Sequence, residues 1–457
     1  MTDLAQPRQR FREAARRTLA RDGVQRMIDS GTAHLAERRL EAWAELTDVE
    51  ALRERARAIR TQTIVDLDGH LDAFRRNAEA RGATVTFCAT AEEATGYITD
   101  ICVSRGAKLV AKSKSMATEE IGVNDALAAV GIRSVETDVG EYLIQLAGEH
   151  PAHIIGPAIE KSAEDAAAVL SLVEGRELPP EPEILLDAAR RQLRSVFLAA
   201  DVGITGVNFG VAETGSICLV TNEGNGRLVT SLPRVHVAVM GLERVVPTLD
   251  DLAVLLQLLP RSAGGQKLSV YTTLLTGPRR ENETDGPDEL HIVVIDNGRS
   301  GLRGTRYQEM LNCIRCGACL NVCPVYRKAG GGAYSSVYSG PMGAVLVPLL
   351  VRVANAPALP HASSLCGACT ASCPVKIPLH DLLLELRRDL VDNRIASRGE
   401  RIGFAIWSWA WSNKFSYRLS TRVVRLLAPL GGRAGPGREW VRGRDLPRLA
   451  KTRFRDR

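Results

Sequence analysis

Two runs of cysteine in the last third of the chain restrict its possible folds more than any other feature. The first run consists of Cys313, Cys316, Cys319 and Cys323, followed directly by Pro324. The second repeats it with Cys366, Cys369 and Cys373 before Pro374, and Ser363 stands where its first cysteine would be. Seven of the ten cysteines therefore lie in one repeated motif. If the two runs act together, the fold has to bring the side chains of these two distant cysteine segments close to each other.

The spacing of the first run is C-x2-C-x2-C-x3-C-P, which is typical of bacterial ferredoxins. Three closely spaced thiolates can hold three corners of one iron–sulfur cube, while the proline interrupts the helix and the fourth cysteine binds the other cluster. The motif predicts two [4Fe–4S] clusters, with Cys313, Cys316, Cys319 and Cys373 on the first and Cys323, Cys366 and Cys369 on the second. The second set lacks one cysteine. That cluster is then either a [3Fe–4S] centre, or a four-iron centre whose last iron is held by water, by Ser363 or by a cysteine from elsewhere.

Zinc is the alternative metal for so many thiolates. A structural zinc site needs two C-x2-C pairs that close one tetrahedron, and it gives no reason for runs that end twice in C-P. A disulfide framework fits less well still, because it is typical of small secreted chains. Thiolate-bound iron indicates a reducing interior, so we expect a cytoplasmic protein. The remaining Cys88, Cys102 and Cys218 lie in apolar surroundings and are expected to be buried free thiols.

The composition is that of an ordinary globular protein with a basic end. The chain has 457 residues, 45% hydrophobic and 25% charged, which is enough for two or three domains. We expect no secretory signal, because the N-terminus is Arg-rich and lacks an apolar core, and no membrane span, because no run of about 18 apolar residues occurs. Residues 401–457 hold 14 Lys and Arg against 3 Asp and Glu, so the net charge of this end is +11. Because the net charge of the whole chain is +6, the rest of the chain carries about −5. A basic tail predicts contact with an acidic partner or peripherally with an anionic membrane surface.

The pattern of apolar residues divides the chain into four regions. Residues 1–80 have helical spacing, and residues 81–300 alternate short Val- and Ile-rich runs with helical stretches, which predicts a layered α/β domain with a largely parallel sheet. The expected strands are residues 83–88, 108–112, 134–137, 202–205, 216–221, 234–240 and 291–295. Residues 301–395 form the helical ferredoxin-type cluster domain, and the 42 residues between its cysteine runs are expected to cover the clusters. Residues 396–457 are a basic, tryptophan-containing C-terminal region.

Three polar, glycine-containing loops follow strands of the predicted α/β domain, at residues 112–115, 205–216 and 222–227. Ligands of open α/β sheets bind at the carboxyl ends of strands, so exposed N–H groups together with Lys112, Ser113 and Lys114 can form an anion site. Ordinary turn chemistry is the alternative, because glycine and asparagine are the default turn residues. Glu141, Glu213 and Glu223 are the carboxylates expected near these loops, as bases or nucleophiles or, more ordinarily, as helix caps and partners of arginine. No dinucleotide or Walker A motif occurs.

These features together resemble the lactate-utilisation iron–sulfur protein B family. The resemblance covers nearly the whole chain and rests on residues 112–116, 136–141 and 206–216, the seven cysteines, residues 363–369 and the Trp-rich end. It implies a central domain similar to the ribose-phosphate isomerase and CoA-transferase fold, two four-iron clusters, and a role beside two partner proteins in oxidising L-lactate to pyruvate. The missing eighth cysteine is typical of the family, and the seven cysteines carry over as ligands.

Three functions are compatible with these residues. The first is an electron-transfer subunit, rather than an autonomous enzyme, which works with other lactate-utilisation proteins and an unidentified electron acceptor, since the two-electron step needs a cofactor elsewhere. The second is a hydro-lyase-type enzyme that uses an open iron of the second cluster as a Lewis acid. The third is a transferase or isomerase with Glu213 as nucleophile. We favour the first.

Overall fold

The structure is a computed structural model that describes residues 8–395, 398–427, 450 and 452. It divides into two compact units, Met1–Asp389 and Leu390–Arg457. The predicted N-terminal helices, α/β domain and cluster domain thus pack together as one unit. Their boundaries at residues 80 and 300 remain a prediction. Part of the predicted C-terminal region, including residues 428–449, lies outside the described residues.

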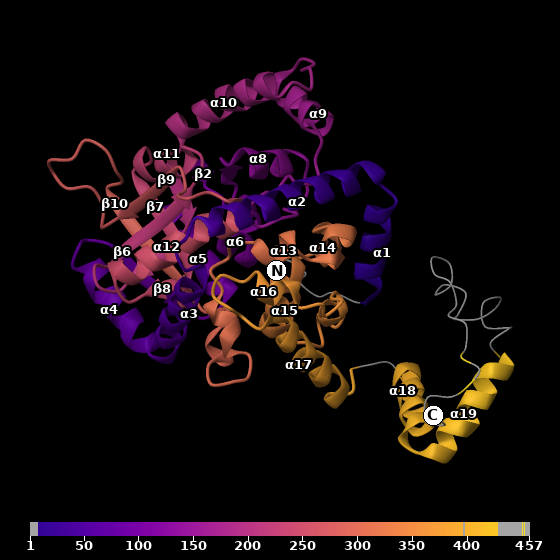
Figure 1. Cartoon of the computed structure of the whole chain (residues 1–457). Coiled ribbons are helices and arrows are strands. Elements are labelled where there is room, and N and C mark those ends of the chain that lie inside the picture. Colours follow the sequence, from indigo (N-terminus) through magenta and orange to yellow (C-terminus); the bar gives the residue numbers. More distant parts are fainter. Residues whose placement is uncertain (1–7, 396–397, 428–449, 451, 453–457) are drawn as a thin grey trace. The chain divides into compact units, whose positions relative to one another are not determined.

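A six-stranded parallel sheet forms the centre of the first unit, in the order β1-β10-β7-β4-β2-β3 (Figure 1). Every neighbouring pair in it is parallel. The middle strand β7 is buried at all seven positions, as expected for a strand covered on both faces. The prediction of a layered α/β domain with a largely parallel sheet is confirmed. The strands are β1 (Thr84–Cys88), β2 (Leu109–Lys112), β3 (Arg133–Glu136), β4 (Val202–Gly206), β7 (Val235–Gly241) and β10 (Glu289–Ile295).

Helices cover both faces of this sheet. Successive residues of β7 point to opposite sides, so Val237 and Val239 pack with α5, α6 and α7, and Ala238 and Met240 pack into the core on the other side. Near β3 the second face is covered by α8, α9 and α10. These helices are α5 (Ala91–Ser104), α6 (Met116–Ile121), α7 (Val123–Ala129), α8 (Val139–Leu146), α9 (Ala163–Glu174) and α10 (Pro182–Ala199).

A second, four-stranded sheet has the order β8-β5-β6-β9. The expected strand at residues 216–221 belongs to this sheet and not to the parallel one. The reason is its short connection to β5, because neighbouring strands joined by a tight turn pair antiparallel, as β5 and β6 do. Its elements and the helices beside it are β5 (Phe209–Val211), β6 (Ser216–Thr221), β8 (Val245–Val246), β9 (Tyr271–Leu275), α11 (Asn225–Ser231), α12 (Leu249–Gly264) and the 3₁₀ turn η1 (Leu242–Arg244).

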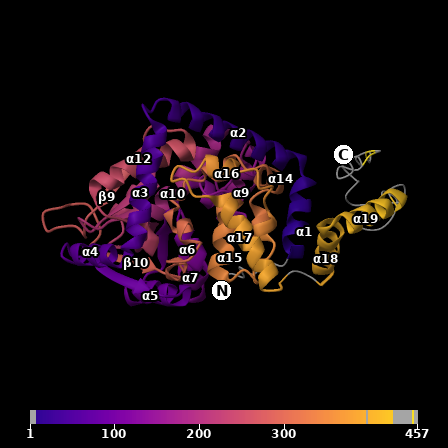
Figure 2. The same cartoon turned by 60° about the horizontal axis from the view of Figure 1, so that its bottom comes forward.

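The N-terminal region is helical, as predicted, and joins the sheet to the cysteine motif. The long helix α2 contacts α12 of the α/β body and also α13 and α14 of the cysteine region (Figure 1), and Figure 2 shows it between α12 and α14. Helix α3 contacts the turn η3 that precedes Cys313. The helices are α1 (Arg8–Leu19), α2 (Asp22–Ala44), α3 (Val49–Val65) and α4 (Leu67–Glu79).

The cysteine region consists of short helices, and its apolar side chains share one continuous core with the second face of the sheet. Leu320, Leu346 and Leu383 belong to the same buried cluster as Ile292 and Met240. The cysteine motif is therefore rigidly placed against the α/β body. Its elements are η2 (Ser300–Leu302), η3 (Gln308–Asn312), α13 (Ala318–Asn321), α14 (Pro324–Ala329), η4 (Gly332–Tyr334), α15 (Gly340–Val351), η5 (Leu359–His361), α16 (Ala368–Ala371) and α17 (Leu379–Asp392).

The second unit contains α18 (Arg398–Ser412) and α19 (Lys414–Leu427), which contact each other. Trp407, Trp409 and Trp411 are all exposed on α18, and the rings of Trp407 and Trp411 lie 6.1 Å apart. Within the described residues, no helix is both long enough and apolar enough to cross a membrane.

Candidate functional site

The two cysteine runs adopt the same local structure. In each, a residue with left-handed backbone precedes the second cysteine of the pattern, Arg315 with φ 60° and Leu365 with φ 57°. In each, a glycine with positive φ then starts a single helical turn, Gly317 before α13 and Gly367 before α16. Only glycine takes this conformation without strain. The repeat seen in the sequence is therefore also a structural repeat, with Ser363 in the place of Cys313.

Four cysteines of the two runs line one small cavity, namely Cys313, Cys316, Cys319 and Cys373. Backbone N–H groups point at the sulfurs: Ile377 donates to Cys373 Sγ at 3.3 Å, and Met342 donates to Cys319 Sγ. Burial raises the pKa of Cys373 to about 12. The sulfurs surround the cavity rather than one point, and no three Cys, His, Asp or Glu side chains of the described residues converge on a single metal ion. This all-thiol donor set fits a thiolate-bound cluster.

Cys323, Cys366 and Cys369 form a second group beside the first. Burial and the charge of Cys323 raise the pKa of Cys369 to about 11, and Cys369 in turn acts on Cys319 of the first group. Cys366 is exposed, and the N–H of Ala368 lowers its pKa. The insertion between the runs was expected to cover the clusters. Met342 of the insertion lines the cavity of the first group, but Cys366 is exposed, so this edge is open to solvent.

Ser363 is half-buried at the position of the missing cysteine. Its hydroxyl accepts a hydrogen bond from the Leu365 amide at 3.0 Å, and its carbonyl accepts one from Arg387 at 2.9 Å. These contacts hold the segment before Cys366 in the same kind of loop that Cys313 begins in the first run.

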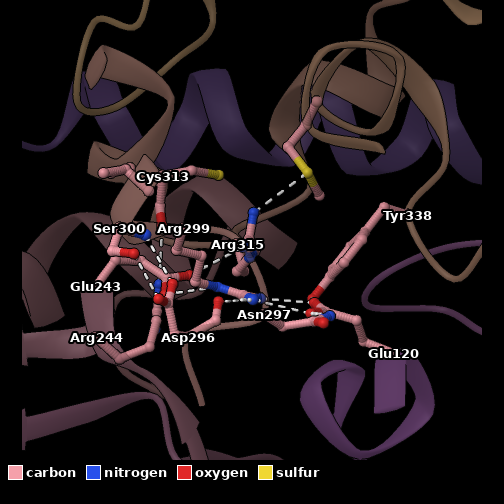
Figure 3. A network of polar contacts seen from close by, with 12 residues as sticks. Glu120, Glu243, Arg244, Asp296, Asn297, Arg299, Ser300, Cys313, Arg315 and Tyr338 are labelled. Carbon is pink, nitrogen blue, oxygen red and sulfur yellow. Dashed lines mark hydrogen bonds and ion pairs between the residues drawn. The ribbon is translucent and has the colours of Figure 1, made fainter. Parts of the chain in front are cut away.

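A buried network of charges joins the first cysteine loop to the sheet (Figure 3). Arg299 lies between two carboxylates, at 2.6 Å from Glu120 Oε2 and 2.9 Å from Glu243 Oε2. Glu243 also pairs with Arg315, at 3.0 Å, and Tyr338 donates its hydroxyl proton to Glu120 at 2.6 Å. Because Arg315 lies inside the first cysteine run, this network positions that loop from α6, from the end of β7 and from the insertion.

Further arginines reach the same loop without a carboxylate partner at ion-pair distance among the described residues. Arg244 donates to the carbonyl of Cys313 at 2.8 Å, and Arg60 donates to the carbonyl of Val245 at 2.8 Å. Burial lowers the pKa of Arg60 to about 9 and of Arg244 to about 10, so both remain cations at neutral pH. Arg60, Arg244, Arg299 and Arg315 outnumber Glu120 and Glu243 by four to two. This excess of buried positive charge faces thiolates that also need compensation.

A cavity of about 680 Å³ opens at the carboxyl edge of the sheet. Residues that follow β2, β4, β6 and β7 line it, together with the loop Ile154–Ile159 and one side of α2. All three polar loops expected from the sequence contribute to it. Two residues, Ile154 and Arg315, line both this cavity and the smaller one that holds the first cysteine group.

The predicted anion-site residues separate in the structure. Ser113 and Lys114 line the large cavity. Lys112 does not line it, because its ammonium is buried between Glu119 at 2.6 Å and Glu136 at 2.5 Å. Lys112 is the last residue of β2, whereas Lys114 lies in the loop after it, so the direction of its side chain no longer follows the strand.

The three carboxylates expected near the loops also have different surroundings. Glu223 lines the large cavity, and burial together with Asp138 raises its pKa to about 7. Glu141 lies in a separate hollow beside Glu136, where burial raises its pKa to about 8. Glu213 is exposed and accepts a hydrogen bond from the Leu249 amide at 3.0 Å, as a helix cap. The buried free thiols were predicted correctly, since Cys88, Cys102 and Cys218 are all buried.

Sequence reasoning missed the arginines of the site. Arg244 and Glu243 lie in a short 3₁₀ turn after β7, and nothing in the local pattern distinguishes them from a surface turn. Arg315 carried the only usable signal, because it lies within the first cysteine run.

Three family models match successive parts of the chain. The LUD domain matches residues 71–295, a 4Fe–4S dicluster domain matches residues 309–377, and the C-terminal model of lactate utilisation protein B matches residues 391–457. The first two coincide with the sheet and with the cysteine region.

Similar proteins carry the same description over their full length. The chain is 46% identical to lactate utilization protein B of Macrococcus caseolyticus over 98% of this chain and 96% of that protein. It is 45% identical to that of Bacillus licheniformis over 98% and 96%, and 47% identical to that of Shouchella clausii over 95% and 94%. A crystal structure of a DUF162 family protein from Deinococcus radiodurans aligns with 50% of this chain and 98% of its own, at 16% identity and a TM-score of 0.29.

Proposed function

The chain belongs to the lactate utilization protein B family, and from this premise we propose that it is an electron-transfer subunit in the oxidation of L-lactate to pyruvate. Two bound iron–sulfur clusters would supply one-electron redox chemistry. We assign Cys313, Cys316, Cys319 and Cys373 to the first, and Cys323, Cys366 and Cys369 to the second. The second is then a four-iron cluster with one non-cysteine ligand, or a [3Fe–4S] centre.

The observation that carries this proposal is the arrangement of the two thiol groups. They lie side by side, close enough for Cys369 to act on Cys319. The first is buried next to the large cavity, and the second reaches the surface at Cys366. A path with one buried end and one exposed end suits transfer between a substrate side and a partner side.

The protein's own residues have defined tasks in this scheme. Arg60, Arg244 and Arg315 place positive charge beside the first thiol group, which favours the more negative, reduced form of a cluster bound there. Backbone N–H groups donate to sulfurs of both groups, to Cys373 in the first and to Cys323 in the second, so the difference between the two sites rests on the arginines. We therefore expect the first site to accept electrons more readily than the second.

Lactate gives up two electrons at once, so the scheme requires a partner with a two-electron cofactor and an electron acceptor. The exposed tryptophans of α18, with the basic C-terminal region, are the candidate surface for such a partner or for a membrane surface. We place the protein in the cytoplasm, because iron-bound thiolates require reducing conditions. We also retain the proposed likeness of the α/β domain to the ribose-phosphate isomerase and CoA-transferase fold.

A second candidate is hydro-lyase-type chemistry at an open iron of the second cluster. Ser363 in place of the eighth cysteine, next to the exposed Cys366, favours it. Addition of a hydroxy acid would then change the spectrum of the isolated protein. The transferase alternative gains no support, because Glu213 caps a helix and does not line the cavity.

The test is anaerobic purification from the native host with the chains that co-purify, followed by addition of L-lactate. We expect bound iron, and reduction of the clusters by lactate, seen in visible absorption and electron paramagnetic resonance. Cys366→Ser should abolish transfer to the acceptor, whereas Cys102→Ala, a buried thiol outside the motif, should retain it. Zinc in place of iron, or clusters that lactate leaves oxidised in the complete assembly, would refute the proposal.

A further inference from the structure

The large cavity at the carboxyl edge of the sheet has the size and position of a small-molecule site. Its volume of about 680 Å³ lies within the roughly 300–1,000 Å³ common for ligand pockets. In parallel α/β sheets the strand ends and their loops form the usual ligand crevice. The six-stranded sheet provides this edge, and the loops after β2 and β4 meet there.

The charges around the cavity favour a small anion. Lys114 lies in its wall and has no ion pair with any described residue, and Arg244 is held there by backbone carbonyls and by the ring of Phe209. Two carboxylates of the wall are compensated: Glu243 pairs with Arg299 and Arg315, and Asp138 caps α8 through the Gly140 amide at 3.1 Å. The third, Glu223, accepts a hydrogen bond from the Val139 amide at 3.4 Å, and burial raises its pKa to about 7, so it is only partly ionised at neutral pH. Lys114 and Arg244 therefore remain without a carboxylate at ion-pair distance among the described residues.

The rest of the wall fits a short acid with one further oxygen. Ser113 and Ser115 line the cavity beside Lys114, and their hydroxyls can donate to a hydroxyl or keto oxygen, although the Ser115 hydroxyl also accepts a hydrogen bond from the Thr118 amide. Val207 and Leu219 line the cavity as well and can receive a short carbon chain. This combination of fixed cations, hydroxyls and apolar side chains matches a 2-hydroxy or 2-oxo acid better than a bare inorganic anion.

The cavity also lies directly beside the first thiol group. Ile154 and Arg315 contribute to the walls of both, so the two cavities are neighbours that share these side chains. Arg315 is fixed there by Glu243 and by contact with Met342 at 3.4 Å (Figure 3).

We propose that this cavity binds a small 2-hydroxy or 2-oxo monocarboxylate, with its carboxylate on Lys114 and Arg244, next to the first thiol group. The chain then forms part of the substrate site and does not only relay electrons. The choice of acid rests on the proposed function, whereas the existence of an anion site rests on the cavity alone.

The test is equilibrium binding of L-lactate, pyruvate and inorganic phosphate to the full chain, purified anaerobically with its iron. We expect lactate or pyruvate to bind and phosphate not to compete. Lys114→Gln should weaken binding by about tenfold or more, because one charge-assisted hydrogen bond is lost, and Lys114→Arg should retain most of it. Lys267→Gln, at an exposed lysine paired with Glu45 away from the cavity, should bind as the wild type does.

Two outcomes overturn the inference: no binding of either acid at millimolar concentration, or unchanged binding in Lys114→Gln with normal iron content. Binding of phosphate alone overturns the assignment of a carboxylic acid. The two proposals fail separately. Lactate-dependent cluster reduction without binding to this chain refutes only the cavity site, and acid binding without cluster reduction refutes only the electron-transfer role.

Discussion

The substitution Glu120→Gln tests whether the buried charge network stabilises the packing of the first cysteine loop against the sheet. Glu120 accepts hydrogen bonds from Arg299 at 2.8 and 2.6 Å, from Asn297 at 2.7 Å and from Tyr338 at 2.6 Å. Its side chain is 1% exposed. Glutamine keeps the shape but removes the charge and turns one acceptor into a donor, which then faces other donors.

The expected loss follows from the burial of the pair. Breaking a buried ion pair by removing one partner typically costs about 3–5 kcal/mol, because the remaining charge is left without compensation. Arg299 keeps Glu243 as a partner, so we expect about 3 kcal/mol. The compact unit has 389 residues. At about 2.1 cal/mol/K per residue its unfolding entropy is about 0.8 kcal/mol/K, so the melting temperature should fall by about 4 °C.

Thermal unfolding followed by far-ultraviolet circular dichroism under anaerobic conditions measures this shift. The matched control is Asp72→Asn, which breaks a pair with Arg75 that is 3.3 Å long and exposed on both sides. Such pairs contribute little, so the control should change the melting temperature by less than about 1 °C. If Glu120→Gln lowers the melting temperature no more than the control does, the network does not stabilise the packing of the cysteine loop against the sheet.

Two further predictions concern single residues of the proposed sites. The raised pKa of Glu223, about 7, reflects burial and the charge of Asp138, opposed by Lys114 and the Val139 amide. Glu223 is therefore mostly neutral at pH 6 and mostly ionised at pH 8, where it repels an incoming carboxylate. Binding of pyruvate should weaken roughly tenfold between pH 6 and pH 8 for this reason. An equally steep weakening in Glu223→Gln would contradict this role of Glu223. Ser363→Cys should slow the loss of iron in air, because the second cluster gains its missing thiolate. Ser195→Cys, at an exposed position of α10 outside the cysteine region, is the control, and equal rates of iron loss in the two variants would count against that assignment.

Local sequence predicted seven of the ten strands that the described residues form. These seven lie where the apolar pattern placed them, because burial on both faces demands continuous apolar runs. The other three, β5, β8 and β9, were not expected, because the first two are very short and the third is partly exposed. The cysteine repeat was equally readable, since the spacing of thiols within one run is a local property of the chain. The sheet to which β6 belongs could not be predicted from the local sequence, because it depends on the tight turn to β5 and on pairing with β5 and β9.

The electrostatics of the site depended on contacts that no local pattern encodes. Lys112 and Lys114 look alike in the sequence, yet one is locked between Glu119 and Glu136 and the other faces the cavity. Arg244 and Glu243, in a short turn after β7, meet the loop of Cys313 across about seventy residues. The pKa of a carboxylate such as Glu223 likewise depends on which distant groups surround it.

The sequence by itself therefore determined the kinds of chemistry present: thiols spaced for iron, strands suited to a parallel sheet, and a family membership that covers the whole chain. Only the tertiary structure decided which charges stand beside those thiols and that a cavity opens next to them. The physical reason is range. Backbone conformation and ligand spacing are set within a few residues, whereas burial and electrostatic compensation are set by segments that meet only when the chain has folded.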